Sequence, residues 1–399
     1  MMREINVTVK SEFIKTYKDG YPLISKESIL SWDKVKEEGL ILNLVDGKGK
    51  FILKAYHGVQ NKGYGWVLST CRDEKIDIAF FTKKIKSALE YREDFFSDDN
   101  TTAFRVLNGE GDGLGGLTID YFDGFYLLTW YSLGIYEFKS DILEALKTSV
   151  KYKGIYQKKR FDSKGKYLDE KDDFICGSKA PAPILVKENG ASFAIYLDDG
   201  AMVGVFLDQR DVRKTIRDKY AKGKTVLNTF SYTGAFSIFA ALGGASKTTS
   251  VDLAKRSLPK TKEQFEINKI DVEKQDIIVE DVFNYFKYAV KKNLLFDLVV
   301  LDPPSFARSK KRTFSASKDY VNLLKEAIQI TKKGGIIVAS TNSANFSMMT
   351  FSDFIRKAFR ELNGKYEIKE RFSLPKDFRV LDKFKEGDYL KVVFIEKIK

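Results

Sequence analysis

The residues most capable of chemistry lie in one polar turn and in the acid that follows it. The turn consists of Phe230, Ser231, Tyr232, Thr233 and Gly234 and comes directly after the short β-rich run 225–229. A second β-rich run, 247–251, leads into Asp252 and Leu253. Asp252 follows the glycine at about the separation at which a ribose-binding acid follows a glycine turn. Strand, tight turn, helix, strand and acid in this order predict a pocket for a nucleotide-like cofactor at the carboxyl edge of a parallel sheet.

A second polar corner follows the apolar run 296–301 and begins with Asp302 and Pro303. Proline fixes φ and turns its carbonyl oxygen outward. A carboxylate beside such a carbonyl can hold the polar edge of a base in line with a methyl–sulfur bond, and alignment does much of the catalysis in such a displacement. With the turn and Asp252, this corner favours S-adenosylmethionine and methyl transfer over hydride transfer. The alternative is a strand-to-loop corner without a ligand.

The pattern also predicts a role for each residue at the cofactor. The backbone N–H groups of 230–234 approach the carboxylate and sulfonium end, and Asp252 accepts hydrogen bonds from two ribose hydroxyls. Asp281 and Val282 follow a third run, 276–279. Asp281 is a candidate acceptor for the adenine amino group and also a good helix N-cap, and the two roles are compatible. We predict Asp302 and Pro303 as catalytic residues, with Asp302 also touching the cofactor.

A basic loop follows the proline corner and carries Lys310, Lys311 and Arg312. Basic residues beside a methyl-transfer edge can bind nucleic-acid phosphates, although a run of this kind is elsewhere a solvated loop. Phe306, between the corner and the loop, either stacks on a base or packs in the core.

The elements that must position these residues alternate between strand and helix from about residue 201. This alternation predicts a doubly wound α/β sheet. Short β-like runs before residue 72 predict a small β-barrel, and the middle of the chain reads as an α+β unit. The predicted domains are 1–72, 73–200 and 201–399. Within the last, the predicted elements are strands at 225–229, 247–251, 276–279, 296–301 and 335–340, helices at 234–242 and 318–332, and a closing antiparallel hairpin from 366–373 and 389–396.

One motif is misleading. Gly111, Gly113 and Gly116 match the spacing of a dinucleotide-binding loop. Such a loop must open a helix, whose N-terminus holds the pyrophosphate. A β-like run, 117–120, follows here instead. We therefore interpret this segment as a structural turn.

Composition limits the partners. The 399 residues include 68 Lys and Arg against 55 Asp and Glu, a formal net charge of +13. An excess of this size is consistent with a phosphate-rich partner, although a lysine-rich surface alone could produce it. The only histidine, His57, excludes multi-histidine metal sites, and no metal is expected. Cys71 and Cys176 form no disulfide pattern, and no apolar stretch approaches a membrane span, so a cytoplasmic protein without a membrane partner is expected.

The chain resembles the large-subunit ribosomal RNA methyltransferases that combine an N-terminal PUA domain, a small central α+β domain and a Rossmann-like methyltransferase domain. The resemblance covers nearly the whole chain and depends on the order of five segments: 109–120, 204–210, 227–234, 250–252 and 302–306. It implies S-adenosylmethionine as donor, 23S ribosomal RNA or a large-subunit particle as acceptor, and an RNA-binding role for the PUA-like domain. It also implies that Gln209 and Arg210 lie near the cofactor. A homodimer is possible, and the sequence does not decide the oligomeric state.

The chain departs from this pattern in the loop 340–347, which reads Ser-Thr-Asn-Ser-Ala-Asn-Phe-Ser. Family members that make 5-methylcytosine carry a cysteine there, because a thiolate must add to carbon 6 of the base before carbon 5 can attack. A base nitrogen needs no such nucleophile. The sequence therefore favours methylation at nitrogen, with cytosine-5 methylation as the alternative that the family suggests. An alternative of another class is a non-catalytic RNA-binding factor for ribosome assembly.

Overall fold

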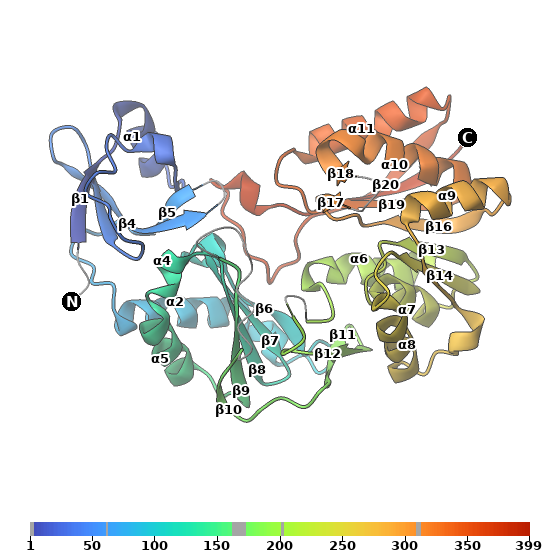
Figure 1. The fold of residues 1–399 in the computed structure, drawn as a ribbon, viewed down its shortest axis with the longest axis horizontal. Coiled ribbons are helices and arrows are strands. Elements are labelled where there is room, and N and C mark those ends of the chain that lie inside the picture. The colour runs from blue at the N-terminus through green and yellow to red at the C-terminus, as the bar shows by residue number, and fades with distance from the viewer. Residues whose placement is uncertain (1–3, 61–62, 162–172, 201–202, 309–312) are drawn as a thin grey trace. The chain divides into compact units, whose positions relative to one another are not determined.

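The computed structural model describes residues 4–60, 63–161, 173–200, 203–308 and 313–399 (Figure 1). The chain divides into two compact units. The first comprises residues 1–186, 195–203 and 376–387, and the second comprises 187–194, 204–375 and 388–399. The segment 376–387, which lies within the predicted domain 201–399, thus belongs to the first unit. Within the described chain, no helix is long and apolar enough to cross a membrane.

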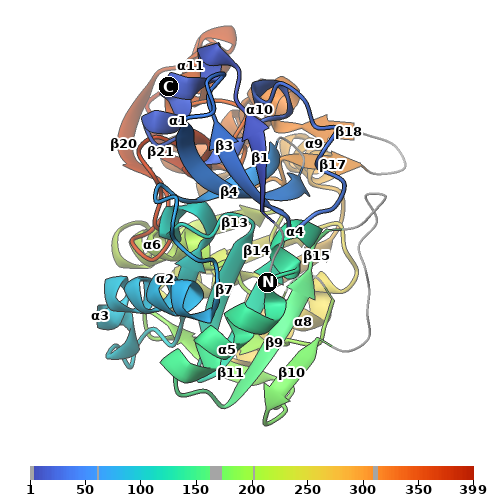
Figure 2. The same ribbon diagram turned by 90° about the vertical axis from the view of Figure 1, so that its left-hand side faces the viewer.

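The first unit begins with a five-stranded sheet of order β1-β3-β4-β5-β2. Figure 2 shows β1, β3 and β4 side by side, in agreement with their hydrogen-bonded register. Alternate residues such as Leu42, Leu44, Leu53 and Ala55 are fully buried, as expected where one face of a sheet covers a core. The elements are β1 (Glu4–Thr8), α1 (Ser11–Lys18), β2 (Leu23–Ile24), β3 (Ile41–Val45), β4 (Phe51–Gln60) and β5 (Gly63–Ser69).

The rest of the first unit is an α+β arrangement around a second five-stranded sheet, of order β10-β9-β8-β7-β6. Helices α2 and α5 pack together over it. Asp123 and Gly124 both have positive φ and make the tight turn between the antiparallel strands β7 and β8. The elements are α2 (Ile78–Tyr91), α3 (Glu93–Phe96), β6 (Ala103–Asn108), β7 (Leu117–Phe122), β8 (Phe125–Trp130), α4 (Leu133–Tyr136), α5 (Lys139–Ser149), β9 (Gly154–Lys159) and β10 (Phe174–Gly177).

The misleading glycine motif is a structural turn, as predicted. Residues 109–112 form a short 3-10 turn, and strand β7 follows, so there is no helix N-terminus to hold a pyrophosphate. Gly111 is required for another reason. A Cβ atom there would lie 1.8 Å from the carbonyl oxygen of Arg379, which belongs to the segment 376–387.

The second unit contains a seven-stranded sheet of order β15-β14-β13-β16-β19-β21-β20. The first five strands are parallel, and β21 pairs antiparallel with both of its neighbours, which confirms the doubly wound α/β fold and its closing hairpin. A short hairpin, β11 (Ile184–Glu188) and β12 (Ala191–Ile195), precedes it. The elements are α6 (Arg210–Thr215), β13 (Thr225–Thr229), α7 (Ala235–Leu242), β14 (Lys247–Asp252), α8 (Ser257–Ile267), β15 (Asp276–Val279), α9 (Val282–Lys291), β16 (Phe296–Leu301), β17 (Phe306–Arg308), β18 (Thr313–Ser315), α10 (Ala316–Ile330), β19 (Thr331–Thr341), α11 (Met348–Glu361), β20 (Tyr366–Phe372) and β21 (Lys391–Lys397).

The central strands of this sheet are buried on both faces, because their side chains alternate between two cores. In β16, Val299 and Leu301 join the core formed with α9, α10 and α11. The intervening Leu298 and Val300 join the core formed with α6 and α7. Figure 1 shows α10 and α11 on one side of the sheet and α6 and α7 on the other. The polar residues that follow each strand are therefore confined to the edges of the sheet.

Several predicted boundaries differ by one or two residues, and the largest difference lies between α10 and β19. The helix predicted at 318–332 ends at Ile330, and strand β19 begins at once with Thr331 instead of at residue 335. The Thr331 hydroxyl donates a hydrogen bond to Ala327 O at 2.7 Å and so caps the last turn. Lys397 Nζ donates to Ile328 O and Thr331 O at 2.7 and 2.8 Å. A lysine from the far end of the chain thus satisfies helix-end carbonyls for which the local sequence provides no partner.

Candidate functional site

The candidate site lies at the carboxyl edge of the parallel strands, and strand register determines which residues share it. Thr229 of β13 pairs with Val251 of β14 and with Leu301 of β16. The next residues, Phe230, Asp252 and Asp302, therefore leave three adjacent strands at the same level. In the same way, Leu301 pairs with Ala339 of β19, so Ser340, near the end of this fourth strand, lies level with Asp302.

The turn 230–234 is held in a strained backbone conformation. Phe230, Tyr232 and Gly234 have φ of 55°, 51° and 79°. Positive φ is a genuine outlier for bulky aromatic residues and persists only where the surroundings impose it. Here Ser231 N donates to Val251 O at 3.1 Å, and Thr233 Oγ1 donates to Gly204 O at 2.7 Å. Strain of this kind, stored at the end of a strand, is typical of a functional site.

Gly234 has a packing role that the sequence did not reveal. The sequence prediction had Gly234 allow close approach of a cofactor. In the structure, a Cβ atom at Gly234 would lie 2.6 Å from Thr261 Cγ2 of α8. The glycine therefore permits both the left-handed turn and the close packing of α8 against it.

Asp252 is bound to the strained turn. Its Oδ2 accepts a hydrogen bond from Tyr232 N at 2.9 Å, and its Oδ1 accepts one from Ala254 N at 2.8 Å. Each carboxylate oxygen can accept a second hydrogen bond. Asp252 can therefore hold the turn and still accept two hydroxyl groups. Leu253, which follows it, is 56% exposed and presents an apolar side chain beside the carboxylate.

Asp281 is the N-cap of α9. Its Oδ1 accepts hydrogen bonds from Phe283 N and Asn284 N at 3.0 and 3.2 Å. Val282, the first residue of the helix, is buried. The structure thus shows the capping role directly, and contact with an adenine amino group is a separate proposal. The Phe283 ring lies 6.4 Å from that of Phe230, which links this helix to the turn.

The acidic corner forms a cluster of three polar side chains. Gln209 Nε2 donates to Asp302 Oδ1 at 3.0 Å and to Ser340 Oγ at 2.7 Å. Desolvation raises the pKa of Asp302 to about 6, and the negative charge of Asp208 contributes in the same direction, while the hydrogen bonds from Ser340 and Gln209 and the charge of Arg213 oppose them. A carboxyl group with a pKa close to neutrality is suited to accept a proton.

Two further residues complete the surroundings of this cluster. Tyr320 of α10 donates its hydroxyl hydrogen to Ser340 O at 2.6 Å and so fixes the end of β19. Arg213 Nη2 donates to Phe206 O at 2.6 Å, and the Phe206 ring lies 5.4 Å from that of Tyr232. Sequence reasoning singled out neither Tyr320 nor Arg213, because no local spacing connects them to the motifs.

The remaining predicted residues are placed as follows. Pro303 is buried directly after Asp302, and Arg210 is buried at the start of α6. Phe306 is 63% exposed on the β17–β18 hairpin and is thus no core aromatic. The basic residues Lys310, Lys311 and Arg312 lie outside the described residues. The arrangement fits an adenosyl cofactor, because it offers an acceptor carboxylate, an apolar side chain and a strained turn at one sheet edge.

Comparisons with known proteins agree with this geometry. The model of the S-adenosylmethionine-dependent methyltransferase family matches residues 105–390, and a PUA-like domain model matches residues 7–70. The chain is 56% identical to the "Putative ribosomal RNA large subunit methyltransferase YwbD" of Bacillus subtilis (strain 168), over 98% of this chain and 99% of that protein. It is 31% identical to ribosomal RNA large subunit methyltransferase I of Yersinia pseudotuberculosis serotype O:1b (strain IP 31758), over 88% of this chain and 89% of the relative.

The fold matches a solved structure with a bound product of the cofactor. The crystal structure of SMU.776 complexed with SAH superposes with a TM-score of 0.91 at 38% sequence identity, covering 99% of this chain and all of the other. The family prediction and the cofactor prediction are thereby confirmed. The chain belongs to the S-adenosylmethionine-dependent methyltransferases and carries an N-terminal PUA-like domain.

Proposed function

We propose that this enzyme methylates a base of large-subunit ribosomal RNA, at a nitrogen that carries a hydrogen. The observation on which the choice of nitrogen depends is the polar cluster of Gln209, Asp302 and Ser340 at the carboxyl edge of the sheet. Ribosomal RNA as the substrate is supported by the names of the two relatives, by the PUA-like domain and by the net charge of +13. A cytoplasmic location belongs to the same proposal.

Cytosine-5 methylation by the covalent route is disfavoured by the residues at this edge. That route requires a thiolate beside the acceptor base. The chain has two cysteines, Cys71 and Cys176, and both belong to the first compact unit. In the second unit, the position near the end of β19 is Ser340, whose oxygen accepts a hydrogen bond from Gln209. A serine hydroxyl ionises far less readily than a thiol and is a poor substitute for that addition.

The cluster is suited to nitrogen chemistry. S-adenosylmethionine supplies the methyl group on a positively charged sulfur. In the proposed reaction, the lone pair of the base nitrogen attacks the methyl carbon, and the carbon–sulfur bond breaks with its electron pair leaving on sulfur. The carboxylate of Asp302 first accepts the N–H hydrogen bond of the base and then the proton, which passes to solvent. Gln209 orients that carboxylate through its amide hydrogen bond.

The surrounding residues are assigned by the same proposal. Asp252 accepts the ribose hydroxyls, Leu253 covers the adenosyl group, and Asp281 accepts the adenine amino hydrogen. Phe306, exposed on the hairpin after the proline corner, stacks on an RNA base, and Lys310, Lys311 and Arg312 contact phosphates. A non-catalytic assembly factor would need neither the desolvated carboxyl group of Asp302 nor the strained turn.

Quantitative mass spectrometry of ribosomal RNA nucleosides tests the proposal. Total RNA is compared between a wild-type strain, a strain lacking the gene, and deletion strains complemented with wild-type protein or with Asp302→Asn. We expect one N-methylated nucleoside of large-subunit RNA to disappear on deletion and to return only with the wild-type protein. Loss of 5-methylcytosine instead would refute the nitrogen assignment, and an unchanged nucleoside profile would refute ribosomal RNA as the substrate.

A further inference from the structure

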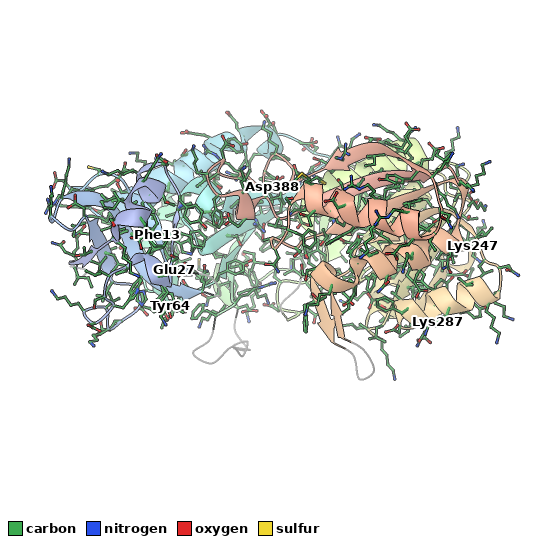
Figure 3. All side chains as sticks on the ribbon, turned by 90° about the horizontal axis from the view of Figure 1, so that it is seen from above. Phe13, Glu27, Tyr64, Lys247, Lys287 and Asp388 are labelled. Atoms are coloured by element: carbon green, nitrogen blue, oxygen red, sulfur yellow. The ribbon has the colours of Figure 1, made fainter. Side chains whose placement is uncertain are left out.

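The last strand of the chain, β21, begins at the end of a short segment, 388–391, that binds two of the loops around the candidate site. The chain belongs to the first unit through Gly387 and to the second from Asp388, which is labelled in Figure 3. We propose that Lys391, at the end of this segment, is a positioning residue that holds the loop 342–347 in the shape that receives the acceptor base. This inference depends on the proposed function, since it deepens the description of the same site.

Lys391 binds backbone carbonyl oxygens with all of its hydrogen-bonding capacity. It is 6% exposed, and its Nζ donates to Ser343 O at 3.1 Å, to Tyr389 O at 3.0 Å and to Asp388 O at 3.3 Å. An ammonium group has three hydrogens to donate, and three carbonyls receive them. Burial of this group lowers its pKa, because removal from water penalises the charged form. A buried charge of this kind adds little to stability by itself.

Strand register explains how one lysine reaches this loop. Lys391 pairs with Thr341, the last residue of β19, so its side chain starts level with the point where the loop leaves the sheet. Inside the loop, Ser343 N approaches Thr341 Oγ1 at 3.3 Å, and Asn345 N approaches Ser343 Oγ at 3.4 Å. These are long hydrogen bonds. The bond from Lys391 to the buried Ser343 is shorter and charged, and it is therefore the firmest of the three contacts.

The same segment also supports the loop that carries Gln209. Tyr389 donates its hydroxyl hydrogen to Asp208 Oδ2 at 2.9 Å. Asp208 precedes the glutamine that bridges Asp302 and Ser340, and its charge acts on Asp302. Through Tyr389 and Lys391, the beginning of β21 thus contacts the two loops that flank the catalytic carboxyl group. In the proposed function, neither Tyr389 nor Lys391 contacts the RNA or the cofactor.

Lys397 offers a matched control in the same strand. It lies at the opposite end of β21, and its Nζ also donates to two backbone carbonyls, those of Ile328 and Thr331. Burial lowers its pKa as well. Replacement of either lysine by methionine removes the same ammonium group and keeps most of the side-chain volume. The two variants therefore differ in what loses its support: the loop 342–347 in Lys391→Met, and the junction of α10 with β19 in Lys397→Met.

The test measures amide hydrogen exchange, S-adenosylmethionine binding and methyl transfer to RNA in Lys391→Met and Lys397→Met. We expect Lys391→Met to exchange amides 342–346 about tenfold faster or more, because their support is lost. Its kcat should fall about tenfold or more, since a small displacement of the acceptor is costly, while cofactor affinity stays within about threefold of wild type. Lys397→Met should show none of these changes. If Lys391→Met does not fold, Lys391→Gln, which keeps one donor, is judged by the same measurements.

Three results would overturn the inference: unchanged protection of 342–346, unchanged kcat despite lost protection, or the same loss of kcat in Lys397→Met. Failure of the proposed function looks different. In that case the wild-type protein itself transfers no methyl group to ribosomal RNA, and the exchange measurement still shows whether Lys391 holds the loop.

Discussion

Replacement of Asp302 by asparagine should stabilise the protein while it abolishes methyl transfer. Asparagine keeps the shape of the side chain and an oxygen that can accept the hydrogen bond from Gln209 Nε2. The substitution removes the ionisable carboxyl group. Desolvation raises the pKa of Asp302 from 3.8 to about 6, so the ionised carboxylate is less favourable in the folded protein than in the unfolded chain.

The size and sign of the effect follow from linkage between proton binding and folding. A carboxyl group with a raised pKa binds its proton more tightly in the folded state. Its contribution to stability is fully present below the unfolded pKa and is lost as the pH rises through the folded pKa. A shift of about two units corresponds to about 3 kcal/mol. Between about pH 4 and pH 7, the free energy of unfolding of Asp302→Asn should therefore rise relative to wild type by up to about 3 kcal/mol.

Asp297 provides a control of opposite sign in β16, the strand that precedes Asp302. Desolvation raises its pKa, but hydrogen bonds from Thr225 and Lys332 outweigh this and lower the pKa to about 2. A carboxylate with a depressed pKa stabilises the fold above the unfolded value and loses that contribution as the pH falls through the folded one. Asp297→Asn should thus be less stable than wild type at pH 7, by about 2 kcal/mol, and the difference should shrink below about pH 4.

Urea denaturation of the three proteins across this pH range measures both differences. Methyl transfer by Asp302→Asn should be about 100-fold slower or more, as is typical for loss of a proton acceptor. The wild-type rate should rise with pH through an apparent pKa near 6. If Asp302→Asn gains no stability between pH 4 and pH 7, the carboxyl group is not desolvated as described, and its role as proton acceptor loses its physical basis.

Four other perturbations probe the cofactor turn and the RNA side of the site. Asp252→Ala should weaken S-adenosylmethionine binding by about 1–3 kcal/mol in calorimetry, through loss of two hydroxyl hydrogen bonds, and unchanged affinity would remove Asp252 from the site. Gly234→Ala should lower the free energy of unfolding by about 1–3 kcal/mol in urea, because φ is 79° and the new Cβ meets Thr261 Cγ2 at 2.6 Å, whereas equal stability would mean that the turn can relax. Phe306→Ala should weaken RNA binding by about 1–3 kcal/mol without affecting cofactor affinity, and replacement of the basic residues 310–312 by alanine should reduce the salt slope of RNA binding by about three. Unaltered RNA binding in Phe306→Ala would show that Phe306 does not contact RNA. An unaltered salt slope would show that the residues 310–312 do not contact phosphates.

Much of the second unit was predictable because its strands are short apolar runs bounded by turns. The strands at 225–229, 276–279 and 296–301 have the predicted bounds. The error at the start of β19 has a different origin. Its first residue, Thr331, ends a helix whose last carbonyls are satisfied by Lys397, and a contact of that kind leaves no trace in the local pattern.

The same distinction applies to the site. Tyr232, Asp252 and Asp302 were predicted from their spacing, because parallel strands bring their carboxyl ends to one edge. The link from Gln209 to Ser340 spans 131 positions of sequence. Gln209 became a candidate only through resemblance to a family, and the bridge it makes to Asp302 was not foreseen. The positions of strand ends can thus be predicted from the periodicity of the sequence. The hydrogen bonds between side chains at different strand ends cannot.

The unfavourable features of the second unit collect where its apolar strands end. From Leu298 to Leu301, strand β16 buries both of its faces, so Asp302 is the first position for a polar group at its carboxyl end. The neighbouring strand, β13, ends in a turn with two aromatic residues at positive φ. The desolvated carboxyl group and the positive-φ residues are both unfavourable for folding. The buried strands around them compensate for a cost of a few kcal/mol. If the site were only structural, substitutions that relieve these costs would be favourable in every respect. If Asp302→Asn gains stability and loses methyl transfer together, as we expect, the cost is explained as part of the catalytic design.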